Sequence, residues 1–96
     1  MKQGKTQKID ELLTLYLKQV GLDRKFKERE VVMIWPEIVG DMIASRTKSV
    51  RVSDGKLFVS FTSPVVKNEI LFVKEGLIAA LNERLREQVI RDLIVV

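Results

Sequence analysis

Basic residues in a stretch that also contains Phe58 form the most distinctive chemical pattern in this sequence. Residues 42–68 hold a single acid, Asp54, against five bases: Arg46, Lys48, Arg51, Lys56 and Lys67. Phe58 lies in the same stretch. Such a pattern is typical of surfaces that bind nucleic acid, because cations contact phosphates and an aromatic ring can stack on a base. We therefore predict a nucleic-acid-binding site formed by Arg46, Lys48, Arg51, Lys56, Phe58 and Lys67.

The same residues also fit a role without a ligand. Lysines on the edge of a β-sheet prevent association with other sheet edges, so the basic stretch could be a solvated hairpin edge. Phe58 could be covered by the N-terminal segment or by a partner, or it could stack on Arg51 alone.

Catalytic and metal chemistry lack their usual residues here. The 96-residue chain contains no Cys and no His, which removes thiolate nucleophiles, the commonest metal ligand and the usual base near neutral pH. The chain also has no Gly-rich phosphate loop, no Gly-x-Ser-x-Gly motif and no Asp-x-Asp cluster. We expect no catalytic residue, no cofactor and no metal site. A net charge of +4 favours a binding protein over an enzyme.

The charge distribution also separates a tail from a domain. Residues 1–8 carry Lys2, Lys5 and Lys8 and no acid, so we expect a basic flexible tail followed by one domain over residues 9–96. No apolar segment follows this start, and the apolar run Ile70–Val73 is far short of the roughly 20 residues of a membrane span. We expect a cytoplasmic protein with no membrane partner.

Helical periodicity dominates the first part of the domain. A spacing of three and four residues predicts a helix with one apolar face, formed by Ile9, Leu12, Leu13, Tyr16, Leu17 and Val20. Tyr16 is expected in the core, with its hydroxyl group at the rim. A linker over residues 22–26 then leads to a second helix with Val31, Ile34, Trp35 and Ile38 on one face. Trp35 is expected in the core, although a role at an interaction surface is the alternative. Pro36 should break or restart this helix, and a last turn should contain Ile43 and Ala44.

After this point the period changes from 3.6 to 2, which is typical of strands. Asp54-Gly55 predicts a two-residue hairpin turn, because both positions of a type I′ turn require positive φ. The turn sets the register and places three pairs on the apolar face: Val52–Leu57, Val50–Val59 and Lys48–Phe61. The opposite face receives Arg51–Phe58, Ser49–Ser60 and Thr47–Thr62. In this register Lys48 lies at the edge of the apolar face and should extend around the sheet.

The last third predicts one helix and one strand. Ser63-Pro64 is a helix start, with Ser as the N-cap and Pro at the first position. The long helix should bury a stripe of apolar residues: Val66, Ile70, Val73, Leu77, Leu81 and Leu85, widened by Leu71 and Ile78. Phe72 lies near the edge of this stripe and is expected in the core, with a partner surface as the alternative. The β-branched residues from Val89 to Val96 predict a third strand, beside either the first or the second.

These elements predict an α+β fold in the order α-α-β-β-α-β. A three-stranded sheet would carry helices on one face and leave the other face in water, which gives a two-layer sandwich of the KH-like kind. Many functions occur on such folds, so the fold alone assigns none.

The sequence also resembles the DciA-like family, long catalogued as a domain of unknown function. The residues that carry the resemblance are Trp35-Pro36-Glu37-Ile38-Val39-Gly40, Ile43-Ala44, Thr47, Asp54-Gly55-Lys56-Leu57, Val59, Ser63, Glu69-Ile70 and Leu81-Asn82-Glu83-Arg84-Leu85. The resemblance implies a KH-like domain without the Gly-x-x-Gly loop of KH domains. It also implies a bacterial DNA-replication factor that binds single-stranded DNA and the replicative helicase DnaB, and that assists helicase loading without catalysing a reaction.

Two other functions are consistent with the sequence. The chain could be a KH-like module that binds RNA in translation, or a protein–protein adaptor whose positive charge has no ligand. Binding to single-stranded DNA and RNA at several salt concentrations separates the three, because the adaptor binds neither and the translation module prefers RNA.

Overall fold

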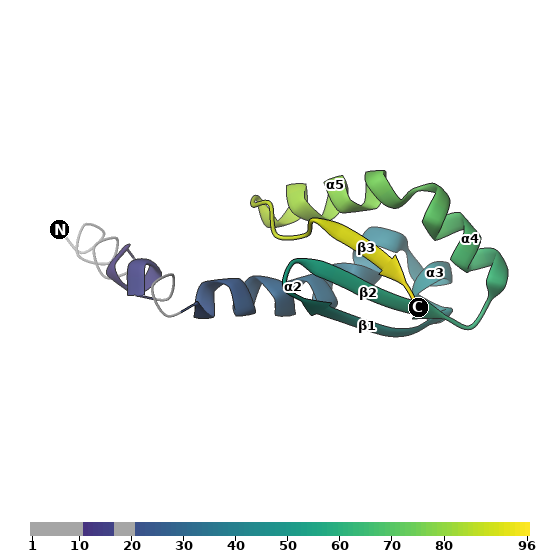
Figure 1. The fold of residues 1–96 in the computed structure, drawn as a ribbon, viewed down its shortest axis with the longest axis horizontal. Helices are drawn as coiled ribbons and strands as arrows, with labels where there is room; N and C mark the ends of the chain where they lie inside the picture. Colours follow the sequence, from purple (N-terminus) through teal and green to yellow (C-terminus); the bar gives the residue numbers. More distant parts are fainter. Residues whose placement is uncertain (1–10, 17–20) are drawn as a thin grey trace.

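The computed structural model describes residues 11–16 and 21–96 (Figure 1). The expected tail over residues 1–8 and both ends of the first expected helix lie outside the described residues. The remaining elements form two layers, a three-stranded sheet and a layer of helices. The α+β architecture and the order predicted from the sequence are confirmed.

The sheet consists of β1 (Thr47–Ser53), β2 (Lys56–Phe61) and β3 (Asp92–Val95), in the order β1-β2-β3. β1 and β2 form the predicted antiparallel hairpin, with Val52 opposite Leu57 and Arg51 opposite Phe58. Asp54 and Gly55 in the turn have φ angles of 52° and 78°, as a type I′ turn requires. β3 is parallel to β2, so the third strand lies beside the second.

The predicted register fails at one end of the hairpin. Phe61 is opposite Thr47 and not Lys48, because a β-bulge lies between Thr47 and Ser49. A bulge adds one residue to a strand and shifts which side chains face the core. Lys48 is therefore exposed and does not lie on the apolar face. The prediction that it extends around the sheet from that face is wrong.

Thr47 occupies the inward position that the bulge creates. Its hydroxyl group accepts a hydrogen bond from the indole Nε1 of Trp35 at 3.1 Å and donates one to the carbonyl of Ile43 at 2.8 Å. Trp35 is 2% exposed, and its ring lies 6.4 Å from that of Phe61. The core role predicted for Trp35 is confirmed, and its N–H group is paired as a buried indole requires.

The second helix is longer and more regular than the sequence predicted. α2 extends from Leu22 to Val39, so residues 22–26 are helical and not a linker, and Pro36 lies inside the helix. Because Pro36 has no N–H group, the carbonyl of Val32 lacks its helical hydrogen bond. Val32 is exposed, so water can take the place of this bond. The expected last turn is present as a separate short helix, α3 (Asp41–Ser45).

The long helix predicted after Ser63 is divided in two. α4 (Pro64–Phe72) and α5 (Lys74–Leu85) meet at Val73. The predicted start is confirmed, because the hydroxyl oxygen of Ser63 accepts the N–H of Val66 at 3.4 Å. The division lets α4 pack on β2 while α5 packs on α2 and β3.

The break at Val73 also changes which side chains are buried. Val66, Ile70, Leu81 and Leu85 lie in the core as predicted, but Leu71 and Val73 are each 47% exposed. Phe72 is 91% exposed, so the prediction that it lies in the core is wrong.

The core lies between the sheet and the helices. Leu57, Val59 and Leu93 point inward from the sheet and pack against buried residues of the helical layer. Val50 and Val52 pack against this core from β1 and are partly buried. The apolar side of the sheet is therefore the inner side, as the alternation of residues predicted.

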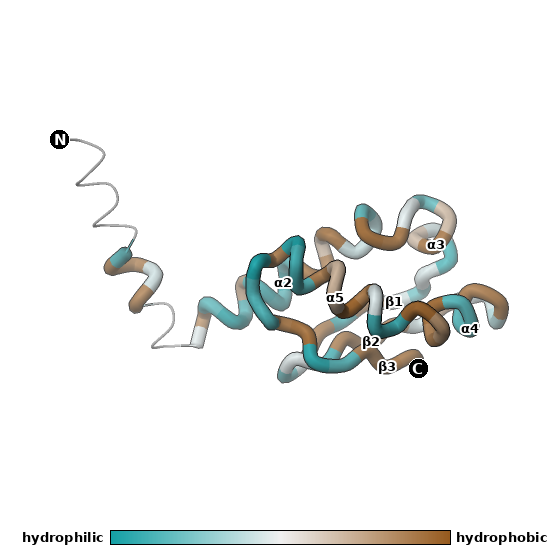
Figure 2. Tube along the Cα trace, turned by 90° about the horizontal axis from the view of Figure 1, so that it is seen from above, coloured by the Kyte–Doolittle hydropathy of each residue, from teal (hydrophilic) through white to brown (hydrophobic). Residues whose placement is uncertain are grey.

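The first predicted helix is present in part, and the apolar residues in its described part are exposed. Residues 11–16 are helical and lie apart from the sheet, beyond the N-terminal end of α2 (Figures 1 and 2). Leu12, Leu13 and Tyr16 are 54–68% exposed. The prediction that Tyr16 lies in the core is wrong, because this segment does not pack on the domain.

Asn82 connects α5 to the segment that leads into β3. Its side-chain oxygen accepts the N–H groups of Val89 and Ile90 at 3.0 and 2.8 Å. Its side-chain nitrogen donates to the carbonyl of Ile90 at 2.8 Å and to Gln88 Oε1 at 3.2 Å. Asn82 is 5% exposed and is the one buried polar residue among those described. These four bonds fix the turn that delivers β3 to the sheet edge.

We expect Asn82→Ala to lower the free energy of unfolding by about 3 kcal/mol. The substitution leaves the buried N–H and carbonyl groups of Ile90 without partners, at about 1–3 kcal/mol for each unpaired group. Urea unfolding followed by circular dichroism measures the change. Asn68→Ala is the matched control, because Asn68 is exposed on α4. Equal stabilities of the two variants would contradict the role of Asn82.

Candidate nucleic-acid interface

The outer face of the sheet is the surface that the helices leave uncovered. The pairings of the three strands place one set of residues on this face: Ser49, Arg51, Ser53, Lys56, Phe58, Ser60, Asp92 and Ile94. Short hydroxyl side chains separate the larger groups, and Ser49 and Ser60 are hydrogen bonded to each other at 2.5 Å. The face is therefore polar with two large apolar groups, Phe58 and Ile94.

Arg51 and Phe58 form the centre of this face. The guanidinium carbon of Arg51 lies 4.3 Å from the centroid of the Phe58 ring, which is a cation–π contact. Arg51 is exposed and Phe58 is partly buried. The stack between the two residues, weighed as an alternative from the sequence, is present. Because Arg51 covers the ring, the flat group available to a ligand is the guanidinium plane, on which an unpaired base can also stack.

The other predicted cations occupy the two ends of the hairpin. Lys56 lies at the turn end. Arg46 and Lys48 lie at the opposite end, where the carbonyl of Arg46 accepts the N–H of Thr62 at 2.9 Å. Lys67 follows in the first turns of α4. The structure thus brings Arg51 and Phe58 together and places Lys48 and Lys56 on β1 and β2, about 17 Å apart along the hairpin at 3.3 Å per residue. Arg46 precedes β1, and Lys67 lies on α4.

The charges of these five cations are not neutralised by the part of the chain that is described. Arg46, Lys48, Arg51, Lys56 and Lys67 are all exposed, and none has a carboxylate among residues 11–16 and 21–96 within 4.0 Å. Only Asp92, opposite Lys56 in the register, brings negative charge to the outer face. The arrangement can attract a polyanion to the face and along the hairpin.

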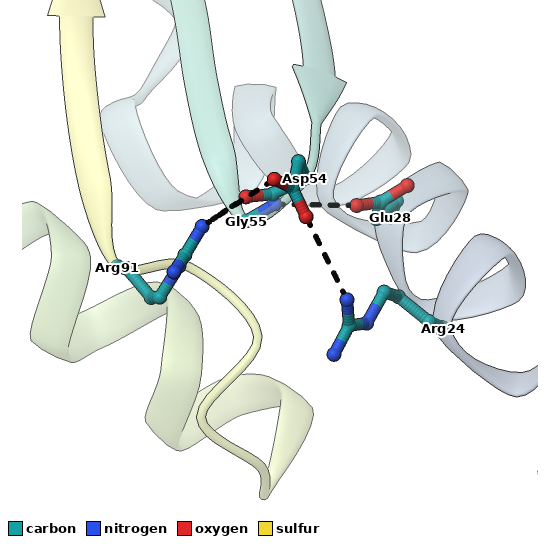
Figure 3. Close-up of polar contacts among 5 residues, drawn as sticks. All are labelled: Arg24, Glu28, Asp54, Gly55 and Arg91. Carbon is teal, nitrogen blue, oxygen red and sulfur yellow. Dashed lines mark hydrogen bonds and ion pairs between the residues drawn. The ribbon is translucent and has the colours of Figure 1, made fainter. Parts of the chain in front are cut away.

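The hairpin turn is held by a polar cluster that the sequence analysis did not identify (Figure 3). The carboxylate of Asp54 forms ion pairs with Arg24 at 3.7 Å and with Arg91 at 3.8 Å. Arg91 also donates to the carbonyl of Asp54 at 2.5 Å, and Glu28 Oε2 accepts the N–H of Gly55 at 3.4 Å. The cluster attaches the turn to α2 and to the segment before β3, so it orients the strands that carry Arg51 and Lys56. No spacing in the sequence predicts contacts between these distant segments.

A side chain at Gly55 would disturb this cluster. A Cβ atom there would lie 2.7 Å from Nε of Arg91, and the φ angle of 78° disfavours other residues. The glycine of the predicted turn therefore also provides the space for the Arg91 contact.

Asp92 pairs with a lysine of the helical layer. Nζ of Lys74 lies 2.8 Å from the Asp92 carboxylate, and both side chains are partly exposed. The hydrogen bond from Lys74, followed by that from the N–H of Leu93, lowers the pKa of Asp92. The same bond with Asp92 raises the pKa of Lys74. This ion pair connects the start of β3 to the start of α5.

Residues 11–16 and 21–96 contain no cluster of three or more acidic side chains placed to hold a metal ion. No helix in these ranges is both long enough and apolar enough to span a bilayer.

The chain is thus a two-layer α+β domain, and helices leave one face of its sheet uncovered. The model of the family described as "Dna[CI] antecedent, DciA" matches residues 8–95. The chain therefore belongs to the DciA family, as the resemblance in the sequence indicated. This family acts in DNA replication, where it has a helicase-loading role, and it is not a family of catalysts. No curated protein matches the chain.

We expect the Lys74–Asp92 pair to make stability depend on pH. The folded-state pKa of Asp92 is lowered, so its contribution is complete above the unfolded pKa, near pH 4, and is lost as pH falls through the folded value. Asp92→Asn should therefore lower the melting temperature at neutral pH, and the difference from the parent chain should shrink as the solution is acidified below about pH 4.

Lys74→Gln serves as the matched variant, because it breaks the same pair from the other side. Because both substitutions break the same ion pair, the double variant should be about as stable as either single variant. If the melting temperatures of Asp92→Asn and the parent chain differ by the same amount at pH 7 and below about pH 4, the role of the ion pair is contradicted.

Proposed function

We propose that this protein binds single-stranded DNA on the outer face of its sheet and binds the replicative helicase DnaB through a separate surface, to assist helicase loading. The observation that carries the proposal is the set of exposed cations on and beside this face, which have no ion-pair partner among the described residues, together with the Arg51–Phe58 stack at its centre. The proposed site comprises Arg46, Lys48, Arg51, Lys56, Phe58 and Lys67.

The mechanism is electrostatic. Cations along β1 and β2 neutralise phosphates, and the release of counterions from the nucleic acid favours binding. The guanidinium plane of Arg51, supported from below by the Phe58 ring, provides a stacking surface for one unpaired base. A preference for single strands follows, because bases in a duplex have no free face.

The rest of the chain completes the proposed organisation. The proposal includes the division of the chain into a basic tail of residues 1–8, with three lysines, and one domain over residues 9–96, of which residues 11–16 lie apart from the sheet. As a replication factor without a catalytic step, the protein acts in the cytoplasm and needs no cofactor.

We expect the double variant Arg51→Glu, Lys56→Glu to bind single-stranded DNA at least tenfold more weakly at low salt. Two phosphate contacts are lost, so the slope of log K against log salt should fall by about 1.4, at about 0.7 per contact. Fluorescence anisotropy with a labelled homothymidine oligomer at several salt concentrations measures both quantities.

Arg84→Glu, Arg86→Glu is the control with the same change of net charge. Both residues are exposed at the end of α5, in the helical layer. Equal weakening in the control would mean that only net charge matters, and the outer face would not be the site. An affinity for an RNA oligomer well above that for DNA would favour the translation module instead. No binding of the parent chain to either would favour the adaptor.

The break between α4 and α5 is the surface that best fits a protein partner. Next to the exposed Phe72 lies a hollow of about 560 Å³, lined mostly by apolar side chains that include Ile38, Val39, Ile43, Ile70 and Leu77. Exposed apolar patches on small proteins mark interaction sites, and aromatic anchors dominate their energetics. We assign the contact with the helicase to this surface, which lies on the helical layer and leaves the outer face free for DNA.

We expect Phe72→Ser to weaken binding to the cognate DnaB at least tenfold, as for an aromatic anchor, and to leave the affinity for single-stranded DNA unchanged. Surface plasmon resonance with immobilised helicase measures the first and anisotropy the second. Met33→Ser is the control, because Met33 is 77% exposed on α2, outside the hollow. Undiminished helicase binding by Phe72→Ser would place the docking surface elsewhere.

A further inference from the structure

A groove between α2 and β1 carries a second set of cations and an exposed aromatic ring. Its volume is about 410 Å³. Phe26, Lys25 and Arg29 line it from the helix, and Arg51 lines it from the strand. The sequence predicts a linker over residues 22–26, so a common surface for these residues was not expected.

The position of the groove follows from the spacing of residues on α2. Val31, Ile34 and Trp35 face the core. A second stripe at intervals of three and four residues, formed by Leu22, Lys25, Phe26, Arg29 and Val32, lies along the neighbouring side of the helix. β1 is the edge strand of the sheet, so this stripe faces the unpaired side of Val50 and Val52 and not another strand.

The charge of the groove suits an anion. Lys25, Arg29 and Arg51 bring three positive charges, and none of them has a carboxylate partner within 4.0 Å among the described residues. Glu28 is the single acid in the lining, and its Oε2 atom already accepts the N–H of Gly55 at 3.4 Å. The lining thus has a net charge of +2, from three bases and one acid.

The aromatic ring of the groove is more accessible than that of the outer face. Phe26 is 53% exposed, whereas Phe58 is partly buried beneath Arg51. The floor around Phe26 is apolar, with Val32, Val50 and Val52 beside it. Cations next to an open ring above an apolar floor match a nucleotide, whose phosphate is anionic and whose base is flat and weakly polar.

Arg51 joins the groove to the outer face. Its side chain lies over Phe58 on that face and also lines the groove, so a strand of nucleic acid that leaves the outer face across β1 reaches Phe26 next. We propose that this groove is a second nucleotide site for single-stranded nucleic acid, in which Phe26 stacks on a base while Lys25 and Arg29 bind the flanking phosphates. The inference rests on the proposed function and extends the binding path around the edge of the sheet.

The test compares Phe26→Ala with the parent chain in the binding of homothymidine oligomers. An oligomer of about twelve nucleotides can occupy both the outer face and the groove, whereas one of about four can occupy only one of them. Phe26→Ala should weaken binding of the longer oligomer about tenfold, the usual loss for one stacked base. Lys25→Gln, Arg29→Gln should lower the salt slope for this oligomer by about 1.4.

Two control variants test whether the loss of DNA affinity in Phe26→Ala comes from lost base stacking, from the removal of any exposed apolar side chain, or from misfolding. Phe26→Tyr keeps a flat ring and should retain the affinity of the parent chain. Met33→Ala removes an exposed apolar side chain of the same helix that lies outside the groove and should not alter DNA binding. A loss of affinity in both Phe26→Ala and Met33→Ala would overturn the assignment of the groove.

The outcomes distinguish the groove from the outer face. In one outcome, the double variant Arg51→Glu, Lys56→Glu binds DNA more weakly than the parent chain, whereas the groove variants bind as the parent chain does. The groove is then not a nucleotide site, and the proposed function stands. If the groove variants lose affinity for DNA while Lys56→Glu does not, the assignment of the outer face as a binding site is wrong and that of the groove is supported. Displacement of the oligomer from the groove by a polyglutamate peptide of equal or higher affinity would show an acidic protein segment as the occupant and would overturn the inference.

Discussion

Burial of one side of the hairpin against α2 is the constraint on which the rest of the structure depends. Leu57 and Val59 are fully buried, and they pack into the cluster that contains Val31 and Trp35 of α2. Side chains alternate along a strand, so once these residues face inward, Arg51 and Phe58 must face outward. A register slip of one residue would place a guanidinium group in the core. The apolar packing therefore fixes the cationic surface, although the cations themselves contribute little to folding.

The sequence predicted those features that depend on local rules. Asp54-Gly55 determined the hairpin and most of its register, because few residues other than these accept the required positive φ angles. The N-cap at Ser63 and the burial of Trp35 also followed from residue types. The outward position of Arg51 beside Phe58 was a consequence of the turn, so the centre of the candidate site was predictable as well.

Features that depend on contacts between distant segments were not predictable. At the bulge, the hydroxyl group of Thr47 bridges Trp35 and Ile43, and no pattern within the strand encodes that bridge. Pro36 was predicted to break or restart the helix, but it lies inside α2, and Val32, whose carbonyl loses its helical hydrogen bond, is 40% exposed. Periodicity identified an apolar face around Tyr16 but could not reveal whether the domain offers a surface to cover it. The exposure of Phe72 similarly reflects the break at Val73, which periodicity alone does not specify.

Polar contacts at the edges of the sheet add to the orientation of the hairpin in a domain whose core has few aromatic residues. Asp54 is attached to both Arg24 and Arg91, so the turn is connected to the first long helix and to the segment before the last strand. These ion pairs are exposed, and exposed pairs contribute little to stability individually. Their geometric effect is larger than their energetic one, because they restrict the direction of the hairpin relative to α2. In a small domain with one sheet and few aromatic residues, the core thus determines which side chains face outward, and the contacts at the hairpin turn attach the strands that carry them to α2.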